Sequence, residues 1–244
     1  MLRWQERHGR TGLTVTGRAG GVSSEPWDSL NLAAHVGDEP AAVAENRRRV
    51  TAALGLREQA LVIASQVHGT RVVVVHGPLG GPPPEADGLV TAVPGLVLGV
   101  LVADCTPVLV AAPDEGLVGV AHAGRRGMAG GVVPELVEVL RAQGAGRLVA
   151  RVGPSVCGRC YEVPLALREE VAAVEPVTRS VTRWGTPALD VAAGVLEQLR
   201  VLGVPAEEVP GCTYEDADLF SYRRARTTGR SAGLAWVEPP GAPA

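Results

Sequence analysis

Three apolar runs in the middle of the chain restrict its fold more than any other feature of the sequence. They span residues 96–103, 107–112 and 117–121 and consist almost entirely of Val, Leu, Ala and Gly. Near-continuous apolar runs of this length are typical of β-strands that are buried on both faces. The sequence therefore predicts a buried sheet at the centre of a mixed α/β fold.

Patterns of further strands and of three helices flank these runs. Additional strands are expected over residues 13–16, 61–64, 71–75 and 147–152. Asp38 is the predicted N-cap of the first helix, with Glu39 and Pro40 in the first turn. Two more helices are expected, one that begins with Pro134 and ends near residue 142, and one over residues 190–202. The chain has no repeat, heptad or linker-like segment, so we expect a single domain, residues 1–244.

Charge and composition argue against two large classes of function. The formal net charge is −3 and aromatic residues make up 3% of the chain, so a basic field and a platform of stacking rings for nucleic acid are both lacking. The longest apolar run falls well short of the ~20 residues that cross a bilayer, and the N-terminal residues lack the apolar stretch of a signal peptide. We expect a cytoplasmic protein with reduced cysteines and with neither nucleic-acid nor membrane partners.

Chemically reactive residues stand at the ends of three apolar segments. His68 belongs to the sequence Ser-Gln-Val-His-Gly, Cys105 to Ala-Asp-Cys-Thr-Pro and His122 to Ala-His-Ala-Gly. Strand ends are where α/β proteins usually build their sites. Two imidazoles and one thiolate suit Zn²⁺ with a fourth position left for water, which zinc activates as a nucleophile near neutral pH.

Each of these three residues also has an ordinary structural explanation. A single His after a strand is most often a hydrogen-bonded loop or core residue, and a single Cys is usually a small buried apolar residue. The separations along the chain, 37 residues from His68 to Cys105 and 17 from Cys105 to His122, match no known ligand motif. The residue types alone therefore leave a shared metal site as one alternative among several.

The remaining cysteines form a second candidate. Cys157 and Cys160 have the C-x-x-C spacing of zinc and redox motifs, but no second pair follows at zinc-finger spacing, and Cys212 is far away in the sequence. The segment 161–164 does not begin a clear helix, as a thioredoxin-like motif would require. We expect a loop that lines the pocket rather than a separate metal or redox site.

Several arginines are candidates for binding an anion, because guanidinium matches the geometry of phosphate. They are Arg47 beside Asn46 on the first predicted helix, Arg126, and Arg223 in the basic run 223–226. A solvated surface is the ordinary alternative for such a run. His35 either faces a pocket or, as is more usual in a Gly/Ala-rich segment, lies in a surface loop.

Taken together, these segments resemble the YfiH family, whose members have been called laccase-domain or polyphenol-oxidase proteins and purine nucleoside phosphorylases. The resemblance covers nearly the whole chain. Each short motif is weak alone, and the specificity comes from their joint presence in this order. The motifs are Gly20–Ser23, Ser29–Leu32, His35–Asp38, Asn46–Arg47, Gln66–Gly69, Ala86–Gly88, Ala103–Cys105, Ala121–Gly124, Gly153–Pro154, Cys160–Val163, Phe220–Arg224 and Thr228–Arg230.

The resemblance implies an α/β fold of αββα layers and a zinc site made by His68, Cys105 and His122, with copper as the alternative metal. It also implies two reactions on purine nucleosides. One is phosphorolysis of adenosine, inosine, guanosine and S-methyl-5′-thioadenosine, and the other is deamination of adenosine. Nucleosides and phosphate are then the expected partners, with Arg47, Arg126 or Arg223 holding the phosphate.

One departure from the family pattern concerns the residue after Ala-His-Ala-Gly. Family members usually carry Trp there, whereas this chain has Arg125. A cation in place of a bulky aromatic ring is expected to change base stacking and substrate preference. For deamination, Asp104 and Glu162 are candidates for the acid that protonates the leaving amine, although Asp104 could instead orient a ligand histidine.

Two other classes of function stay open. Cys105 and His122 could form a metal-free thiolate–imidazolium pair for acyl transfer or deamidation. The protein could instead be a non-catalytic partner whose zinc is structural. A copper oxidase fits poorly, because the chain has five His and no His-x-His pair. We expect a monomer, since no predicted helix presents an apolar face to solvent.

Overall fold

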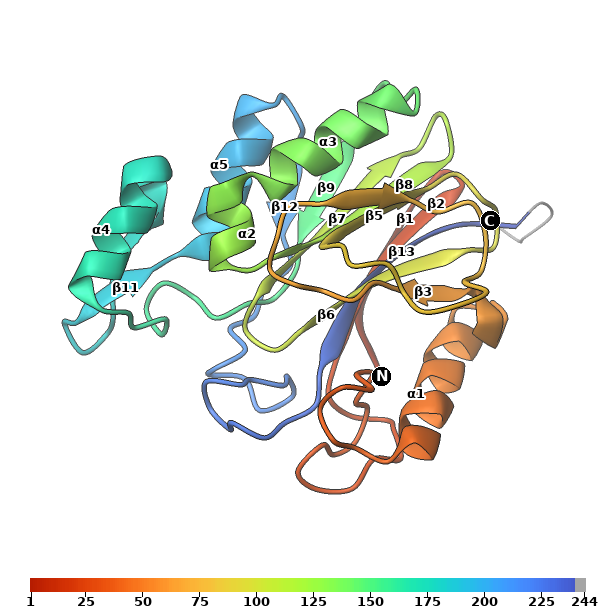
Figure 1. The fold of residues 1–244 in the computed structure, drawn as a ribbon, viewed down its shortest axis with the longest axis horizontal. Helices are drawn as coiled ribbons and strands as arrows, with labels where there is room; N and C mark the ends of the chain where they lie inside the picture. Colours follow the sequence, from red (N-terminus) through yellow and green to blue (C-terminus); the bar gives the residue numbers. More distant parts are fainter. Residues whose placement is uncertain (240–244) are drawn as a thin grey trace.

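The computed structural model describes residues 1–239, in which two mixed β-sheets stack face to face (Figure 1). The first sheet has the order β1 (Leu2–His8), β2 (Thr11–Thr16), β13 (Ser231–Val237), β6 (Val97–Val102) and β3 (Leu61–Ile63). The second has the order β12 (Ala206–Glu208), β9 (Val149–Val152), β7 (Thr106–Ala112), β8 (Leu117–Ala123), β5 (Gly88–Thr91) and β4 (Val72–Val74). The predicted apolar runs form β6, β7 and β8, and all their residues are buried.

Helices cover the outer face of each sheet. Helix α1 (Pro40–Ala53) packs its Val50 against the first sheet, whose Trp236 is fully buried there. Helices α3 (Val132–Ala142) and α5 (Val191–Val201) cover the second sheet through residues such as Leu136 and Leu199. A third apolar cluster, which includes Leu109 and Val120, fills the space between the sheets. The layers therefore run α, β, β, α, and the predicted α/β class is confirmed.

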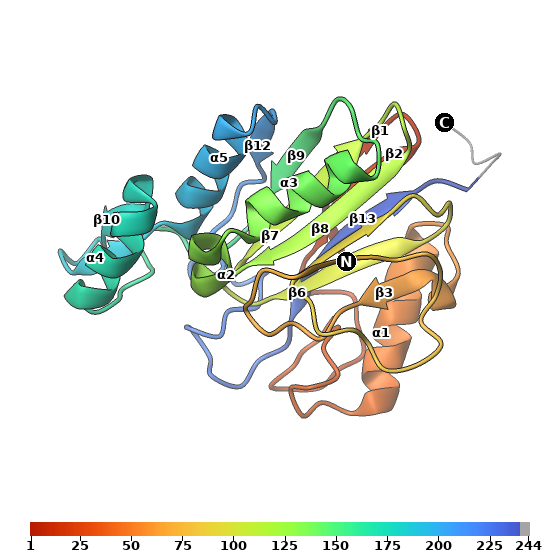
Figure 2. The same ribbon diagram turned by 45° about the horizontal axis from the view of Figure 1, so that its top comes forward.

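Smaller elements extend the molecule beside the second sheet. Helix α2 (Arg125–Gly130) directly follows β8. Helix α4 (Leu165–Val174) and the hairpin of β10 (Arg179–Val181) with β11 (Pro187–Leu189) lie together at one end of the molecule in both views (Figures 1 and 2). Short 3-10 turns occupy Glu58–Ala60 and Pro176–Thr178. Within residues 1–239, no helix is long and apolar enough to cross a bilayer.

Two helix starts differ from the sequence prediction. Glu39, rather than Asp38, is the N-cap of α1. The Asp38 carboxylate is instead buried, where it accepts hydrogen bonds from Ser23 Oγ at 2.6 Å and Asn31 Nδ2 at 2.9 Å. Helix α3 begins at Val132, so Pro134 lies inside its first turn, where a missing N–H costs nothing. Both differences arise because capping signals are short and tertiary contacts decide among them.

Candidate functional site

His68, Cys105 and His122 converge at the end of the second sheet where β7 begins and β8 ends. His68 follows β3, Cys105 directly precedes β7, and His122 lies near the end of β8. The β7–β8 hairpin pairs Pro107 with His122, which brings His122 beside Cys105. Their ligand atoms all lie within 4.8 Å of one another. We call these three residues the pocket cluster.

Asp87 positions two members of the pocket cluster through hydrogen bonds to the His122 side chain and to the backbone around His68. Its fully buried carboxylate lies 2.8 Å from His122 Nδ1. The same carboxylate accepts the backbone N–H groups of Val67, His68 and Gly69 at 3.2, 3.0 and 2.7 Å. An ionised Asp87 therefore keeps the proton on Nδ1 and leaves His122 Nε2 free to face Cys105, which is the usual support for a metal-binding histidine.

The electrostatics of the pocket cluster favour a thiolate. Burial alone would raise the pKa of Cys105, but hydrogen bonds to His122 and His68 outweigh burial and lower it to about 6. Burial would likewise lower the pKa of His122, yet its bonds to Asp87 and Cys105 raise it to about 9. Burial also opposes ionisation of Asp87, but the hydrogen bonds from His122, Gly69 and Val67 together with the charge of His122 outweigh burial and lower the pKa of Asp87. Without a metal, Cys105 and His122 thus form an ion pair.

The backbone around the pocket cluster is strained at two residues and approaches the ligand side chains closely at a third. His68 and Asp104 have positive φ angles of 60° and 98°, which non-glycine residues seldom adopt. Such strain persists where surrounding contacts enforce it, as the bond from the His68 N–H to Asp87 does here. Gly124 passes so near that a Cβ there would lie 3.0 Å from the His68 ring and 3.2 Å from Cys105 Sγ. A larger residue at this position would press on the His68 ring and on Cys105 Sγ.

The pocket cluster opens on a cavity of about 570 Å³, a size typical of small-molecule sites. The lining is strongly cationic, because Arg125, Arg223, Arg226 and Arg230 all belong to it, and we call these four residues the arginine wall. Three of these guanidiniums also lie over aromatic rings: that of Arg223 over Tyr161, and those of Arg226 and Arg230 over Tyr222. The remaining lining is His35, Gln66, His68, Leu101, Ala103, Asp104, Cys105, His122, Ala123, Val156, Tyr161, Val191 and Tyr222.

The structure separates the anion-binding candidates of the sequence. Arg223 lines the cavity, whereas Arg126 is exposed and its neighbour Arg125 lines the cavity instead. Arg47 donates its Nε and Nη2 to the carbonyl of Leu32 and is not among the lining residues. His35 lies exposed in a turn and also lines the cavity, so both interpretations of this residue apply.

The two acid candidates occupy different surroundings. The Asp104 carboxylate accepts hydrogen bonds from Thr213 Oγ1, Ser221 Oγ and the Arg223 N–H at 2.6–2.7 Å, which makes it a structural anchor. Glu162 is exposed and does not line the cavity. The carboxylate that orients a histidine is Asp87. The sequence placed Asp87 within the family motif Ala86–Gly88 but predicted no role for it.

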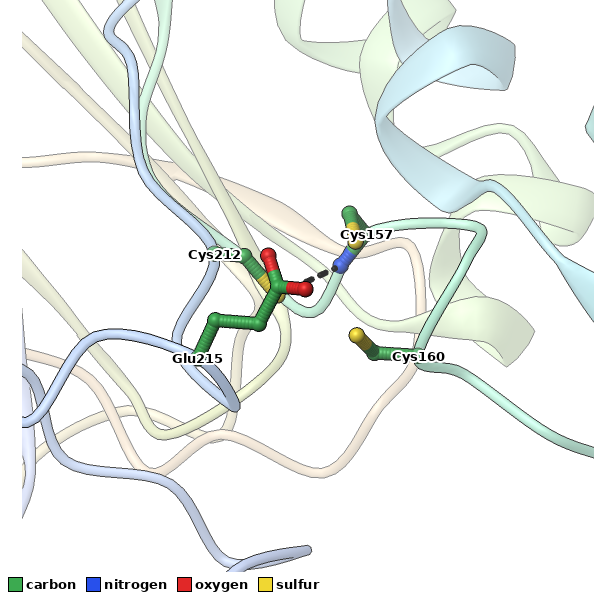
Figure 3. A group of neighbouring side chains, drawn as sticks. All are labelled: Cys157, Cys160, Cys212 and Glu215. Carbon is green, nitrogen blue, oxygen red and sulfur yellow. Dashed lines mark hydrogen bonds between the residues drawn. The ribbon is translucent and has the colours of Figure 1, made fainter. Parts of the chain in front are cut away.

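The loop that carries Cys157 and Cys160 lines the cavity through Val156 and Tyr161, as predicted, and the three remaining cysteines also converge at this loop. Cys157 and Cys160 lie in the loop between β9 and α4, and Cys212 follows β12. Strands β9 and β12 pair in parallel, and a bridge between Ser155 and Cys212 continues this pairing. Together with Glu215, the ligand atoms lie within 4.8 Å of one another (Figure 3). We call these four residues the three-cysteine cluster.

The fold and the site together define a class of protein. Its members have αββα layers and a Cys/His cluster that opens on an arginine-rich pocket. Over residues 12–238 the chain matches a family described as multi-copper polyphenol oxidoreductase laccase. Solved structures of similar fold include YlmD from Geobacillus stearothermophilus (TM-score 0.87, 32% identity, 95% of this chain and 93% of that chain). The hypothetical protein YfiH from Bacillus licheniformis also matches (TM-score 0.85, 28% identity, 93% of each chain). The chain belongs to this laccase-like YfiH family.

The relatives in sequence have a different kind of name from the family description. A Streptomyces coelicolor protein named purine nucleoside phosphorylase is 54% identical over 227 residues, which cover 91% of this chain and 94% of that protein. A Streptomyces griseus protein with the same name is 53% identical over 235 residues, or 94% and 96% of the two chains. The near-complete coverage shows that these proteins share the whole fold with this chain.

Proposed function

We propose that this protein is a zinc-dependent purine nucleoside phosphorylase that uses adenosine, inosine, guanosine and S-methyl-5′-thioadenosine, with adenosine deamination as a second activity. The observation that carries the proposal is the cavity itself, in which a Cys/His cluster and four arginines face the same space. The names of the relatives support the same chemistry.

The pocket cluster fits a zinc ion on the chemistry of its donors. Two imidazole nitrogens and one thiolate are preferred zinc ligands, and the cavity lies on the open side, where a fourth ligand would stand. Zinc bound there would supply Lewis-acid polarisation of the group that occupies this fourth position. Asp87 orients His122, and the N–H groups of residues 67–69 keep Asp87 ionised within the protein.

The arginine wall is the proposed phosphate site. In phosphorolysis, a phosphate oxygen forms a bond to C1′ of the ribose while the C1′–N9 bond breaks. The base leaves with that electron pair and takes up a proton. Arg223, Arg226 and Arg230 can neutralise the phosphate, and their stacking on Tyr161 and Tyr222 fixes them with little entropy left to lose. Leu101 and Val156 offer apolar contacts for the base.

The test is conversion of adenosine to adenine and ribose 1-phosphate by the purified, zinc-loaded protein. Release of adenine should require phosphate. Deamination of adenosine to inosine should not require it. His68→Ala should abolish both activities, whereas His76→Ala, an exposed histidine away from the cavity, should change neither. Phosphate-independent release of adenine, or an active His68→Ala variant, would refute the proposal.

A second candidate function rests on one observation, namely that Asp87, His122 and Cys105 form a chain of contacts like that of a cysteine hydrolase. In that case Cys105 attacks an acyl or amide carbonyl and the metal is unnecessary. Loss of amidase activity on alkylation of Cys105 in metal-free protein would favour this function. Zinc-dependent turnover of nucleosides would exclude it as the main activity.

A further inference from the structure

The three-cysteine cluster lies outside the machinery proposed above, and its sulfur atoms are largely covered by protein, whereas Glu215 is exposed. Cys160 is 1% exposed and Cys212 is 9% exposed, and both pack against Val156 and Tyr214. The C-x-x-C turn is tight, because the N–H groups of Cys160 and Tyr161 both donate to the Cys157 carbonyl. The turn thus directs two sulfurs toward a third that arrives from a distant part of the chain (Figure 3).

Hydrogen-bond donors point at the sulfur atoms of this cluster. The Cys157 N–H lies 3.4 Å from Cys212 Sγ, and Arg183 Nη2 lies 2.7 Å from Cys160 Sγ. The same Arg183 nitrogen is 2.7 Å from Glu215, and Arg159 is 3.8 Å from that carboxylate. Donors of this kind stabilise thiolates rather than thiols. Two nearby guanidiniums also offset the charge of −2 that three thiolates and a carboxylate would leave around a divalent cation.

Neither ordinary explanation accounts for this arrangement. A disulfide needs two sulfurs and leaves the third thiol and the carboxylate without a purpose. Cysteines that act as small apolar core residues would not attract an arginine to their sulfur. Four soft or acidic ligands around one point, with no opening to the cavity, are instead the pattern of a structural metal site.

We propose that Cys157, Cys160, Cys212 and Glu215 bind a structural Zn²⁺, distinct from the pocket cluster. A tetrahedral zinc with Zn–S bonds of about 2.3 Å holds its sulfurs about 3.8 Å apart, which requires only a slight contraction of the present cluster. The three thiols release their protons when the ion binds. Thiolate-rich sites of this geometry select zinc over magnesium or calcium.

This zinc would brace one wall of the pocket. Thr213, next to Cys212, donates its hydroxyl to Asp104 at 2.7 Å, and the N–H of Val156 donates to the Asp104 carbonyl at 3.0 Å. Asp104 directly precedes Cys105 of the pocket cluster. The structural ion would therefore hold together the loop and the turn that position Asp104, whichever reaction the pocket performs. The inference does not depend on the proposed function.

Zinc content of the full-length protein tests the inference. Zinc-loaded wild type should contain two ions per chain, Cys157→Ser/Cys212→Ser should lose one, and His68→Ala/Cys105→Ala should keep one. If Cys157→Ser/Cys212→Ser holds as much zinc as wild type, the site does not exist. A disulfide within the cluster, mapped by mass spectrometry in the native protein, overturns the inference equally.

Cobalt loading gives a second readout that does not need the cysteine variant to fold. His68→Ala/Cys105→Ala, which retains only the three-cysteine cluster, should bind Co²⁺ with strong sulfur-to-cobalt charge-transfer absorption, and an absence of these bands overturns the proposal. Glu215→Gln should lose this metal to a chelator sooner than Glu170→Gln, an exposed matched control. Equal retention refutes Glu215 as the fourth ligand. Neither measurement uses a nucleoside, so failure of the phosphorylase proposal leaves this test intact.

Discussion

The pocket cluster and the three-cysteine cluster use similar ligand types in opposite settings. The pocket cluster offers three ligands, of which His68 is exposed and Cys105 half-buried, and it opens on a cavity. The three-cysteine cluster offers four ligands, of which the three cysteines pack among apolar side chains and Glu215 is exposed at the rim. Catalytic zinc sites keep one position open whereas structural ones are closed. Ligand number and access, more than ligand type, therefore separate a site for chemistry from a site for stability.

Metal removal should show the largest difference between the two clusters. A chelator should reach the open pocket cluster first and lower phosphorolysis about 1,000-fold, since lost metal polarisation is worth about 4 kcal/mol of barrier. One zinc should leave at this stage, and added zinc should restore activity. Parallel measurements of zinc content, activity and melting temperature follow the process. Simultaneous loss of both ions would contradict the distinction between open and closed clusters.

In metal-free protein, the cysteines of the two clusters should also differ in their rate of labelling. With a pKa of about 6, Cys105 is mostly thiolate at pH 7, and its labelling should decline as the pH falls through 6. Burial and the neighbouring Cys157 raise the pKa of Cys160 to about 12, so Cys160 stays protonated at pH 7. Only a very small fraction of Cys160 is thiolate at pH 7, and the greater nucleophilicity of a thiolate of higher pKa offsets only part of this difference. We therefore expect about 100-fold faster alkylation of Cys105 by iodoacetamide at pH 7. Peptide mapping measures both rates, and equal rates would refute the electrostatic assignment.

Asp87→Asn tests the support behind the pocket cluster. The amide no longer fixes the His122 tautomer as an anion does, and loss of such a partner typically lowers metal affinity or activity about 10- to 100-fold. The zinc of the three-cysteine cluster should be unaffected. Competition with a zinc indicator measures both affinities. Asp114→Asn, which alters only an exposed ion pair with Arg147, is the matched control and should behave as wild type.

Arg226→Gln should have the smallest effect, confined to the anion side of the pocket. We expect the KM for phosphate to rise about 10-fold, as for loss of one charge-assisted contact of roughly 1.4 kcal/mol. The KM for the nucleoside should change little. Arg126→Gln is the control, because Arg126 is exposed and does not line the cavity. If both variants bind phosphate as wild type does, the arginine wall is not the phosphate site.

The buried centre of the fold could be predicted from sequence because its signal is local. Strands β6, β7 and β8 are apolar at almost every position, which few other structures allow. Strand β1 was missed because Leu2–His8 is mostly polar and lies at a sheet edge, where its residues alternate between half-buried and exposed. Strand β13 and helix α4 were also missed, although Gly229 precedes the strand and Pro164 is the N-cap of the helix.

The candidate site could be predicted only in part. His68, Cys105 and His122 each end an apolar strand, so residue chemistry alone suggested them. Asp87 carried no such signal, because its role comes from the N–H groups of residues 67–69 folding around it. Cys212 joins Cys157 only through the parallel pairing of β9 with β12, a contact between distant segments that no local pattern encodes.

The hairpin that joins β7 to β8 has a consequence far from the cavity. Its turn, residues 113–116, lies at the opposite end of the two strands from Cys105 and His122, yet it sets which residues face each other along the whole ladder. An inserted residue that shifted this alignment by one position would turn the His122 imidazole to the other side of the sheet. The length of this remote turn thus helps to determine the geometry of the pocket cluster. Insertions or deletions in the turn should be expected to affect the cluster as substitutions of its ligands would.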